Sequence, residues 1–159
     1  ASWLTDGSLG LYWGTGTPYD RDSSENGYFF AVKDSNPQSC TSFSAEPITD
    51  CGSSGIYKLE EGEGLTGDPL VYAGVVYFST WVPDEDRCNG GEGRLYGLNF
   101  TDCSEGIDTN GDGEVDDSDG DYVGHEDEYL SSITVTEQGK IMYGTSNPDV
   151  NEPRRLVER

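Results

Sequence analysis

The sequence predicts an all-β protein built from antiparallel sheets. Eight segments of strand length are rich in Val, Ile, Tyr, Phe and Thr, and polar turn residues separate them. No long segment shows the 3.6-residue periodicity of an amphipathic helix. Two short connections, Ala73-Gly74 and Gln138-Gly139, are typical of the tight hairpin turns that join antiparallel strands.

The expected strands span residues 9–14, 27–32, 56–59, 69–72, 75–81, 94–100, 132–136 and 140–144. Each is a short apolar or aromatic run bounded by Gly, Asp, Ser or Asn, which is the usual signature of a strand. Three long polar segments, residues 16–26, 34–55 and 101–130, are expected to be loops. Loops of this size in compact domains are usually functional or disordered.

A repeated pattern indicates how the strands are grouped. Residues 11–16 and 27–32, with a polar loop between them, resemble residues 76–80 and 93–98, and residues 140–146 begin the pattern again. Repeated four-stranded units marked by aromatic residues and glycine are typical of β-propeller blades.

The expected fold is therefore about two blades of a partial β-propeller. Residues 1–60 would form the first unit, and residues 61–159 the second, with an insertion at 101–130. Because a propeller closes with roughly four to eight blades, we expect the chain to belong to something larger or to complete its sheets against another chain.

The chain is strongly acidic, with 31 Asp and Glu residues against 9 Lys and Arg among 159 residues and a formal net charge of −22. Nucleic acid is excluded as a partner, because phosphate binding needs clustered Lys and Arg. Anionic membrane surfaces are disfavoured for the same reason. Solubility or adaptation to a salty medium explains the charge as well as a cation-binding role does.

The length fits one domain or a piece of one. The sequence has no apolar stretch of about eighteen residues, so we expect no membrane span. It also has no signal-peptide pattern at Ala1, so an exported form would be mature, processed or a fragment.

Four cysteines, Cys40, Cys51, Cys88 and Cys103, lie in Gly-, Ser- and Asp-rich surroundings without the close spacing of zinc or iron–sulfur ligands. Their even number favours disulfides. We expect Cys40–Cys51 and Cys88–Cys103, each closing one loop between strands, and buried free thiols are the alternative. Disulfides indicate a location outside the cytoplasm.

Residues 108–119 are the most specific motif. Oxygen-bearing residues occupy positions 1, 3, 5, 9 and 12 of this twelve-residue loop, which is the spacing of Ca²⁺ ligands. Gly113 occupies position 6, where the loop turns sharply. The candidate ligands are the side chains of Asp108, Asn110, Asp112, Asp116 and Asp119 and the backbone carbonyl of Glu114.

Two features of this loop limit the comparison with an EF-hand. Asp119 replaces the bidentate Glu of the strongest EF-hands, so affinity is expected to be lower. No helix signal precedes the loop, which makes it a single loop rather than a paired EF-hand. The alternative is an ordinary solvated loop in an acidic chain.

The order of these motifs resembles the C-terminal region of PilY-type proteins, the large calcium-binding factors and tip adhesins of type IV pili. The resemblance rests on residues 68–71, 74–80, 82–91 and 93–98 followed by the Asp-x-Asn-Gly-Asp-Gly loop, and upstream on residues 14–16 and 28–34. It covers most of residues 9–146.

The resemblance implies a quinoprotein-like β-propeller that is exported and acts in pilus assembly, extension, retraction and surface attachment. It implies a calcium site at the six residues named above. The expected partners are pilins or other pilus subunits, the remainder of a larger propeller chain, or further copies of the chain. The large variable N-terminal portion of that family has no counterpart here, so adhesion housed there is not assigned.

Other functions remain as alternatives. One alternative is a structural subunit of an extracellular filament or surface layer. A fragment of a quinoprotein dehydrogenase is a less favoured alternative, because two blades cannot surround a cofactor. We expect no enzyme activity: His125, the only histidine, is expected at the surface, and no nucleophile is placed to use it. Trp3, Trp13 and Trp81 are expected mostly to fill blade interfaces and strand faces, with a glycan-stacking platform as the alternative.

Overall fold

The computed structural model describes residues 1–16, 26–39, 44–48, 51–52, 54–84, 90–145 and 155–156. Every regular element in these residues is a β-strand, so the all-β fold expected from the sequence is confirmed. No helix in this part of the chain is long and apolar enough to cross a membrane.

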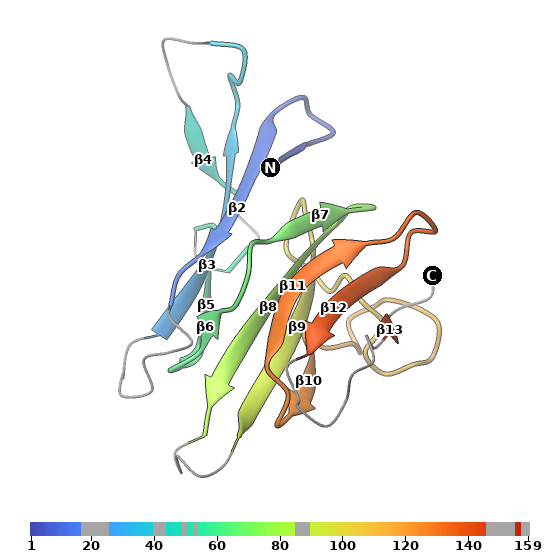
Figure 1. Ribbon diagram of the computed structural model, residues 1–159. Coiled ribbons are helices and arrows are strands. Elements are labelled where there is room, and N and C mark those ends of the chain that lie inside the picture. Colours follow the sequence, from blue (N-terminus) through green and yellow to red (C-terminus); the bar gives the residue numbers. More distant parts are fainter. Residues whose placement is uncertain are drawn as a thin grey trace.

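The strands form three antiparallel sheets (Figure 1). The first sheet contains β1 (Ser2–Trp3), β2 (Leu9–Gly14), β3 (Asn26–Asp34), β4 (Ala45–Pro47) and β5 (Ile56–Glu61). The second contains β6 (Gly64–Leu65), β7 (Leu70–Tyr72), β8 (Val75–Pro83), β9 (Gly91–Asn99) and β10 (Tyr122–Glu126). The third contains β11 (Leu130–Val135), β12 (Ile141–Thr145) and β13 (Arg155–Leu156).

The two hairpins expected from short turns are present. Strands β7 and β8 pair around Ala73-Gly74, whose φ angles of 51° and 86° are the positive values that a type I′ turn requires. Strands β11 and β12 pair around the second turn, which contains Gln138 and Gly139. The two repeated sequence patterns correspond to the long antiparallel pairs β2–β3 and β8–β9.

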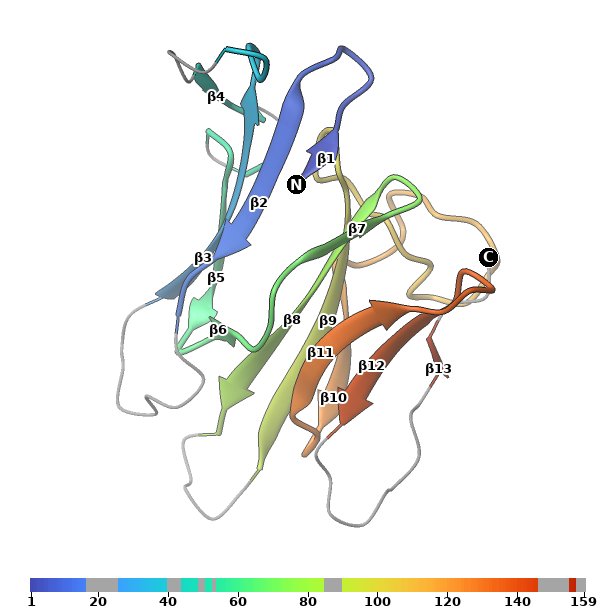
Figure 2. The same cartoon turned by 45° about the horizontal axis from the view of Figure 1, so that its top comes forward.

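The second sheet lies between the other two, and both of its faces are buried (Figure 2). On one face, Phe78 stacks between Phe29 of the first sheet and Tyr96, at ring-centroid distances of 4.2 and 4.7 Å. On the other face, Val75 and Tyr77 pack with side chains of the third sheet. Because β8 is buried on both faces, residues 75–81 are all apolar or hydroxyl-bearing, without the alternation of apolar and polar residues that a strand with one solvated face shows.

A buried carboxylate joins the first and second sheets. Glu63, which is 1% exposed, lies in the turn between β5 and β6. Its carboxylate accepts hydrogen bonds from Arg94 Nη1 at 3.2 Å, from the Tyr96 hydroxyl at 2.9 Å and from the Thr80 hydroxyl. Backbone packing is close here too, because a Cβ added at Gly27 would lie 2.3 Å from the Glu63 carbonyl oxygen. A larger residue at Gly27 would displace the turn that holds Glu63.

The expected loops contain strands that the sequence did not indicate. Strand β10 forms inside the predicted loop 101–130 and pairs with β9, so that prediction was wrong at residues 122–126. Pairing with β9 and packing of Tyr122 and Val123 against the core outweigh the polar local sequence. Strand β4 likewise forms inside the predicted loop 34–55, and residues 17–25 of the predicted loop 16–26 lie outside the described residues.

The disulfide pairing expected from the sequence was wrong. Cys51 and Cys103 are bonded to each other, with 4.7 Å between their Cα atoms, and both are buried. The sequence predicts bridges that each close a local loop, whereas stacking of the sheets brings the segment after β4 against the segment after β9. Cys40 and Cys88 lie outside the described residues. The bond is compatible with an extracellular location.

Candidate functional site

The segment 108–119 lies in the long connection between β9 and β10, away from the sheet layers (Figure 2). Both ends of this segment are attached to β9. Before it, Ile107 is buried in the core and the Gly106 amide donates to the Gly97 carbonyl at 2.8 Å. After it, the Gly97 amide donates to the Asp121 carbonyl at 3.1 Å. The segment is therefore a loop held at its base, with residues 110–118 exposed.

The first expected ligand, Asp108, accepts hydrogen bonds from the loop that it begins. Its Oδ1 accepts from the Gly111 amide at 2.6 Å, and its Oδ2 accepts from the Gly113 amide at 2.9 Å. Gly111 and Gly113 have φ angles of 79° and 93°, which residues with a Cβ rarely adopt. The backbone turns at Gly113, the position where the sequence led us to expect a turn.

The next side chains repeat one local geometry. The Oδ1 atoms of Asn110, Asp112 and Asp116 each accept the amide hydrogen two residues further along the chain, at 2.9, 2.9 and 2.8 Å. Each such Asx turn makes the backbone bend around its own side chain. Bonds from the hydroxyl and amide of Ser118 lower the pKa of Asp116, so this carboxyl group is ionised at neutral pH.

Asp119 closes the loop. Its Oδ1 accepts from the amides of Thr109 at 2.8 Å and Asn110 at 3.1 Å, and its Oδ2 accepts from the Asp116 amide at 3.0 Å. The bond from Asp116 is the main cause that lowers the pKa of Asp119. Asp119 thus ties the end of the loop to its beginning.

The donor atoms in this loop fit Ca²⁺ in kind, because all are carboxylate, amide or carbonyl oxygens. Among the described residues, no group of three or more His, Cys, Asp or Glu side chains is gathered as a metal site. The side-chain oxygens of the loop accept hydrogen bonds from its own amides, and each carboxylate oxygen has a second lone pair that an ion can use.

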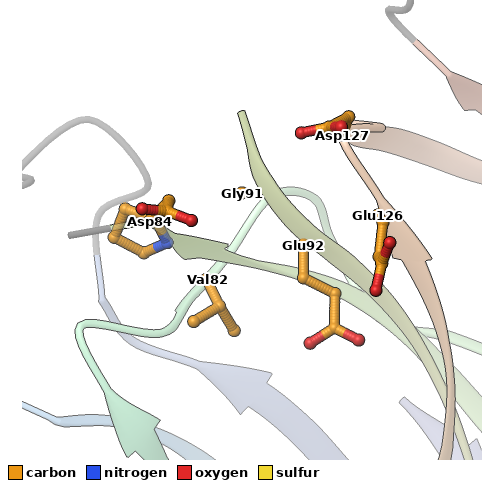
Figure 3. A pocket seen from close by; sticks show the side chains of 7 residues that line it. Val82, Asp84, Gly91, Glu92, Glu126 and Asp127 are labelled. Carbon is orange, nitrogen blue, oxygen red and sulfur yellow. The ribbon is translucent and has the colours of Figure 1, made fainter. Parts of the chain in front are cut away.

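An acidic pocket of about 760 Å³ opens elsewhere, at the ends of β8 and β10 and the start of β9. Figure 3 shows its lining residues, which are Val82, Pro83, Asp84, Gly91, Glu92, Glu126 and Asp127. The Glu92 carboxylate also accepts a 2.7 Å bond from Arg94. Several carboxylates at one opening attract cations in general, whereas residues 108–119 have the spacing of a defined site.

His125 is not the surface residue that the sequence suggested. Only 13% of its side chain is exposed, its Nδ1 lies 3.7 Å from Glu128 Oε2, and its Nε2 lies 3.2 Å from the Tyr143 hydroxyl. His125 is enclosed because β10 pairs with β9 and packs near the third sheet. Since β10 itself was not expected, this cluster had no signal in the sequence.

The three tryptophans all lie on strands, as expected. Trp81 is buried, whereas Trp13 and Trp3 are 42% and 60% exposed. Trp13 and Trp3 belong to the first sheet, on the face that points away from the second sheet.

In comparisons with known proteins, no protein-family model, no curated protein and no solved structure matches this chain.

Proposed function

We propose that this chain is an exported, non-enzymatic protein of type IV pilus or other cell-surface machinery that binds Ca²⁺ through residues 108–119. The observation that carries the proposal is the loop itself. Its oxygen-bearing residues have calcium-ligand spacing, and its backbone already turns at Gly111 and Gly113 with the expected first ligand, Asp108, inside the turn.

Each residue has a distinct role in the proposed site. Asp108, Asn110 and Asp112 supply side-chain oxygens, and Glu114 supplies its backbone carbonyl. Asp116 binds directly or through water, and Asp119 completes the set. Bound Ca²⁺ would offset the repulsion among these carboxylates. On binding, the side chains can keep their hydrogen bonds to loop amides and bind the ion through the remaining lone pairs, so the loop becomes more rigid.

The extracellular setting is supported by two independent features. The Cys51–Cys103 disulfide is of a kind that persists in oxidising compartments. The shorter Asp119 side chain suits a weak site, and weak sites are filled outside the cell, where Ca²⁺ is near millimolar.

The pilus assignment rests on the resemblance to PilY-type proteins, in which residues 1–60 and 61–159 would supply about two blades of a larger propeller. The partners would then be pilins, other pilus subunits or the rest of a larger propeller.

A second candidate function is a structural subunit of an extracellular filament or surface layer. The exposed aromatic side chains on the outer face of the first sheet favour it, because subunits of an assembly must present apolar contact surfaces.

Isothermal titration calorimetry tests the calcium site. We expect the parent chain to bind one Ca²⁺ in this loop with a dissociation constant on the order of 10⁻⁴ to 10⁻³ M. Asp112→Ala removes one proposed ligand and should weaken binding at least tenfold. Asp117→Ala is the matched control, because it removes an equal charge from a position of the same loop that supplies no ligand.

Equal affinities in the parent and in Asp112→Ala would refute the site. Equal weakening by both substitutions would mean that the loop attracts cations only through its overall charge. The setting is tested by fractionating source cells: we expect the chain in the sheared pilus or surface fraction, and recovery in the cytoplasm would contradict the proposal.

A further inference from the structure

The turn after β9 contains a motif that the proposed calcium site does not use, Asn99-Phe100-Thr101. Asn-x-Thr, with any residue except proline in the middle, is the acceptor motif for N-linked oligosaccharides in exported proteins. Among the asparagines of the chain, only Asn99 is followed two residues later by Ser or Thr. A modification that reads this motif would therefore be confined to one position.

The motif lies at the surface, where the second sheet ends. Asn99 is the last residue of β9, and residues 100–102 form the turn that follows. The Cys103 amide donates to the Asn99 carbonyl at 2.8 Å, and the Asn99 amide donates to the Ser104 carbonyl at 2.8 Å. Thr101 and Ser104 are exposed. An attached oligosaccharide is bulky and stays in solvent, so a surface turn can carry one without disturbing the core.

The middle residue of the motif holds the turn in place. Phe100 packs against the core that the first and second sheets share. Its amide donates to the Gly74 carbonyl at 3.1 Å, and its carbonyl accepts from the Tyr12 hydroxyl. The turn therefore presents Asn99 and Thr101 in a fixed orientation.

The side chains of Asn99 and Thr101 contact each other. Asn99 Oδ1 accepts hydrogen bonds from the Thr101 amide at 3.0 Å and from the Thr101 hydroxyl at 2.7 Å. The Asn99 Nδ2 atom donates to no described residue, and it is not among the buried side-chain atoms without a partner in this part of the chain. The nitrogen is therefore in contact with solvent, while the oxygen fixes the hydroxyl that the motif requires.

The chain makes the same turn twice with aspartate. Asp102 Oδ1 accepts from the amide and the hydroxyl of Ser104 at 3.0 and 2.7 Å. Asp6 Oδ1 accepts from the amide and the hydroxyl of Ser8 at 2.9 and 2.5 Å. A carboxylate thus suffices for a turn of this kind. The asparagine at position 99 adds what the two aspartates lack, a side-chain nitrogen atom.

We propose that Asn99 is a site of N-linked glycosylation. The proposal rests on the exported location in the proposed function, because this modification is made on exported chains. In the transfer, Nδ2 of Asn99 forms a bond to the anomeric carbon of an oligosaccharide carried on a lipid pyrophosphate. The bond from that carbon to the pyrophosphate oxygen breaks. The lipid pyrophosphate leaves with the electron pair, and Nδ2 loses one proton to a base of the transferase.

Mass spectrometry of the chain isolated from the surface fraction of source cells tests the proposal. We expect the peptide that contains Asn99 to carry added sugar masses. Asn99→Asp should lose the modification completely while keeping the oxygen that accepts from Thr101, so its circular dichroism should be unchanged. Asn36→Asp is the matched control, because it makes the same change at an exposed asparagine outside the motif. It should retain the modification in full.

Two changes at Thr101 separate recognition of the motif from the fold. Thr101→Ser keeps a hydroxyl at this position and should retain the modification. Thr101→Val removes the hydroxyl at nearly equal volume and should abolish the modification. Loss in Thr101→Val together with retention in Thr101→Ser would show that the motif is read as an acceptor.

Three results would overturn the proposal. An unmodified Asn99 in the parent chain from the surface fraction would leave the turn with a structural role only, and it would leave the exported location intact. Sugar masses that persist in Asn99→Asp would place the modification at another residue. Recovery of the chain in the cytoplasm, without sugar, would refute the exported location and this proposal together.

Discussion

Replacing Glu63 by Gln is expected to destabilise the fold more than any comparable change of an exposed carboxylate. The Glu63 side chain is buried. Its two carboxylate oxygens accept hydrogen bonds from the side chains of Arg94, Thr80 and Tyr96 and from the Glu60 amide. The substitution preserves the shape of the side chain but removes its charge and turns one acceptor oxygen into a donor amide. At least one of the surrounding donors then faces another donor.

The magnitude follows from what is lost. A hydrogen bond to a charged group contributes about 1.5–3 kcal/mol, and a buried donor without an acceptor costs a further 1–3 kcal/mol. Arg94 keeps its bonds to Glu60 at 3.0 Å and to Glu92 at 2.7 Å, so the loss is smaller than for a charge left alone. We expect Glu63→Gln to lower the free energy of unfolding by about 3 kcal/mol.

Urea unfolding followed by tryptophan fluorescence measures this difference. Glu60→Gln is the matched control, since Glu60 pairs with the same Arg94 but its side chain is 62% exposed. An exposed ion pair contributes about 1 kcal/mol or less, so this control should remain close to the parent. A free energy of unfolding of Glu63→Gln within about 0.5 kcal/mol of the parent value, or equal losses in the two variants, would refute this role of Glu63.

Three further outcomes are expected. The hydroxyl and amide of Ser8 donate hydrogen bonds to the Asp6 carboxylate, and these bonds lower the Asp6 pKa from 3.8 to about 2. The ionised carboxylate therefore stabilises the fold above pH 3.8, and this contribution is lost as the pH falls through 2. Ser8→Ala should return the NMR titration midpoint of Asp6 toward 3.8. Replacing both Cys51 and Cys103, which are 52 residues apart, by Ala should cost about 4 kcal/mol in urea unfolding, and unchanged stability would contradict a structural role for the bond. Gly27→Ala places a Cβ 2.3 Å from the carbonyl oxygen of Glu63 and should cost about 1–3 kcal/mol. A neutral effect in the same assay would mean that the turn before β6 does not lie against β3.

The longer strands could be recognised from the sequence because their composition alone specifies them. All eight expected segments overlap observed strands, since runs such as residues 75–81 contain enough β-branched and aromatic residues to need no context. Strands β1, β4, β6 and β13 have 2, 3, 2 and 2 residues. Such strands are defined by the partner that they pair with, so their own residues give no usable signal.

Features that depend on stacking of the sheets could not be predicted. The Cys51–Cys103 bond, the contact of His125 with Tyr143 and the contact of Glu63 with Arg94 all join residues from separate parts of the chain, and spacing along the sequence carries no information about such contacts. For Trp13, the sequence predicted the strand but not which side of it is exposed. Its strand was recognised, but which face of that strand lies outside depends on where the second sheet packs.

The loop at 108–119 was predictable from the sequence only in part. Its glycine turns were specified locally, because positive φ angles at Gly111 and Gly113 follow from the residue type. The partners of its oxygens were not, since the Asp108 and Asp119 carboxylates accept hydrogen bonds from particular amides of the loop, Gly113 and Thr109 among them. Ligand spacing in a sequence specifies which atoms are available, and the ion itself supplies the energy that would gather them.

A crystal structure of the chain grown with millimolar Ca²⁺ tests the central claim most directly. We expect one ion in the loop with six to eight oxygen ligands at about 2.3–2.6 Å. The ligands should include the side chains of Asp108, Asn110 and Asp112 and the backbone carbonyl of Glu114. A loop that holds no ion at saturating Ca²⁺ would contradict this claim.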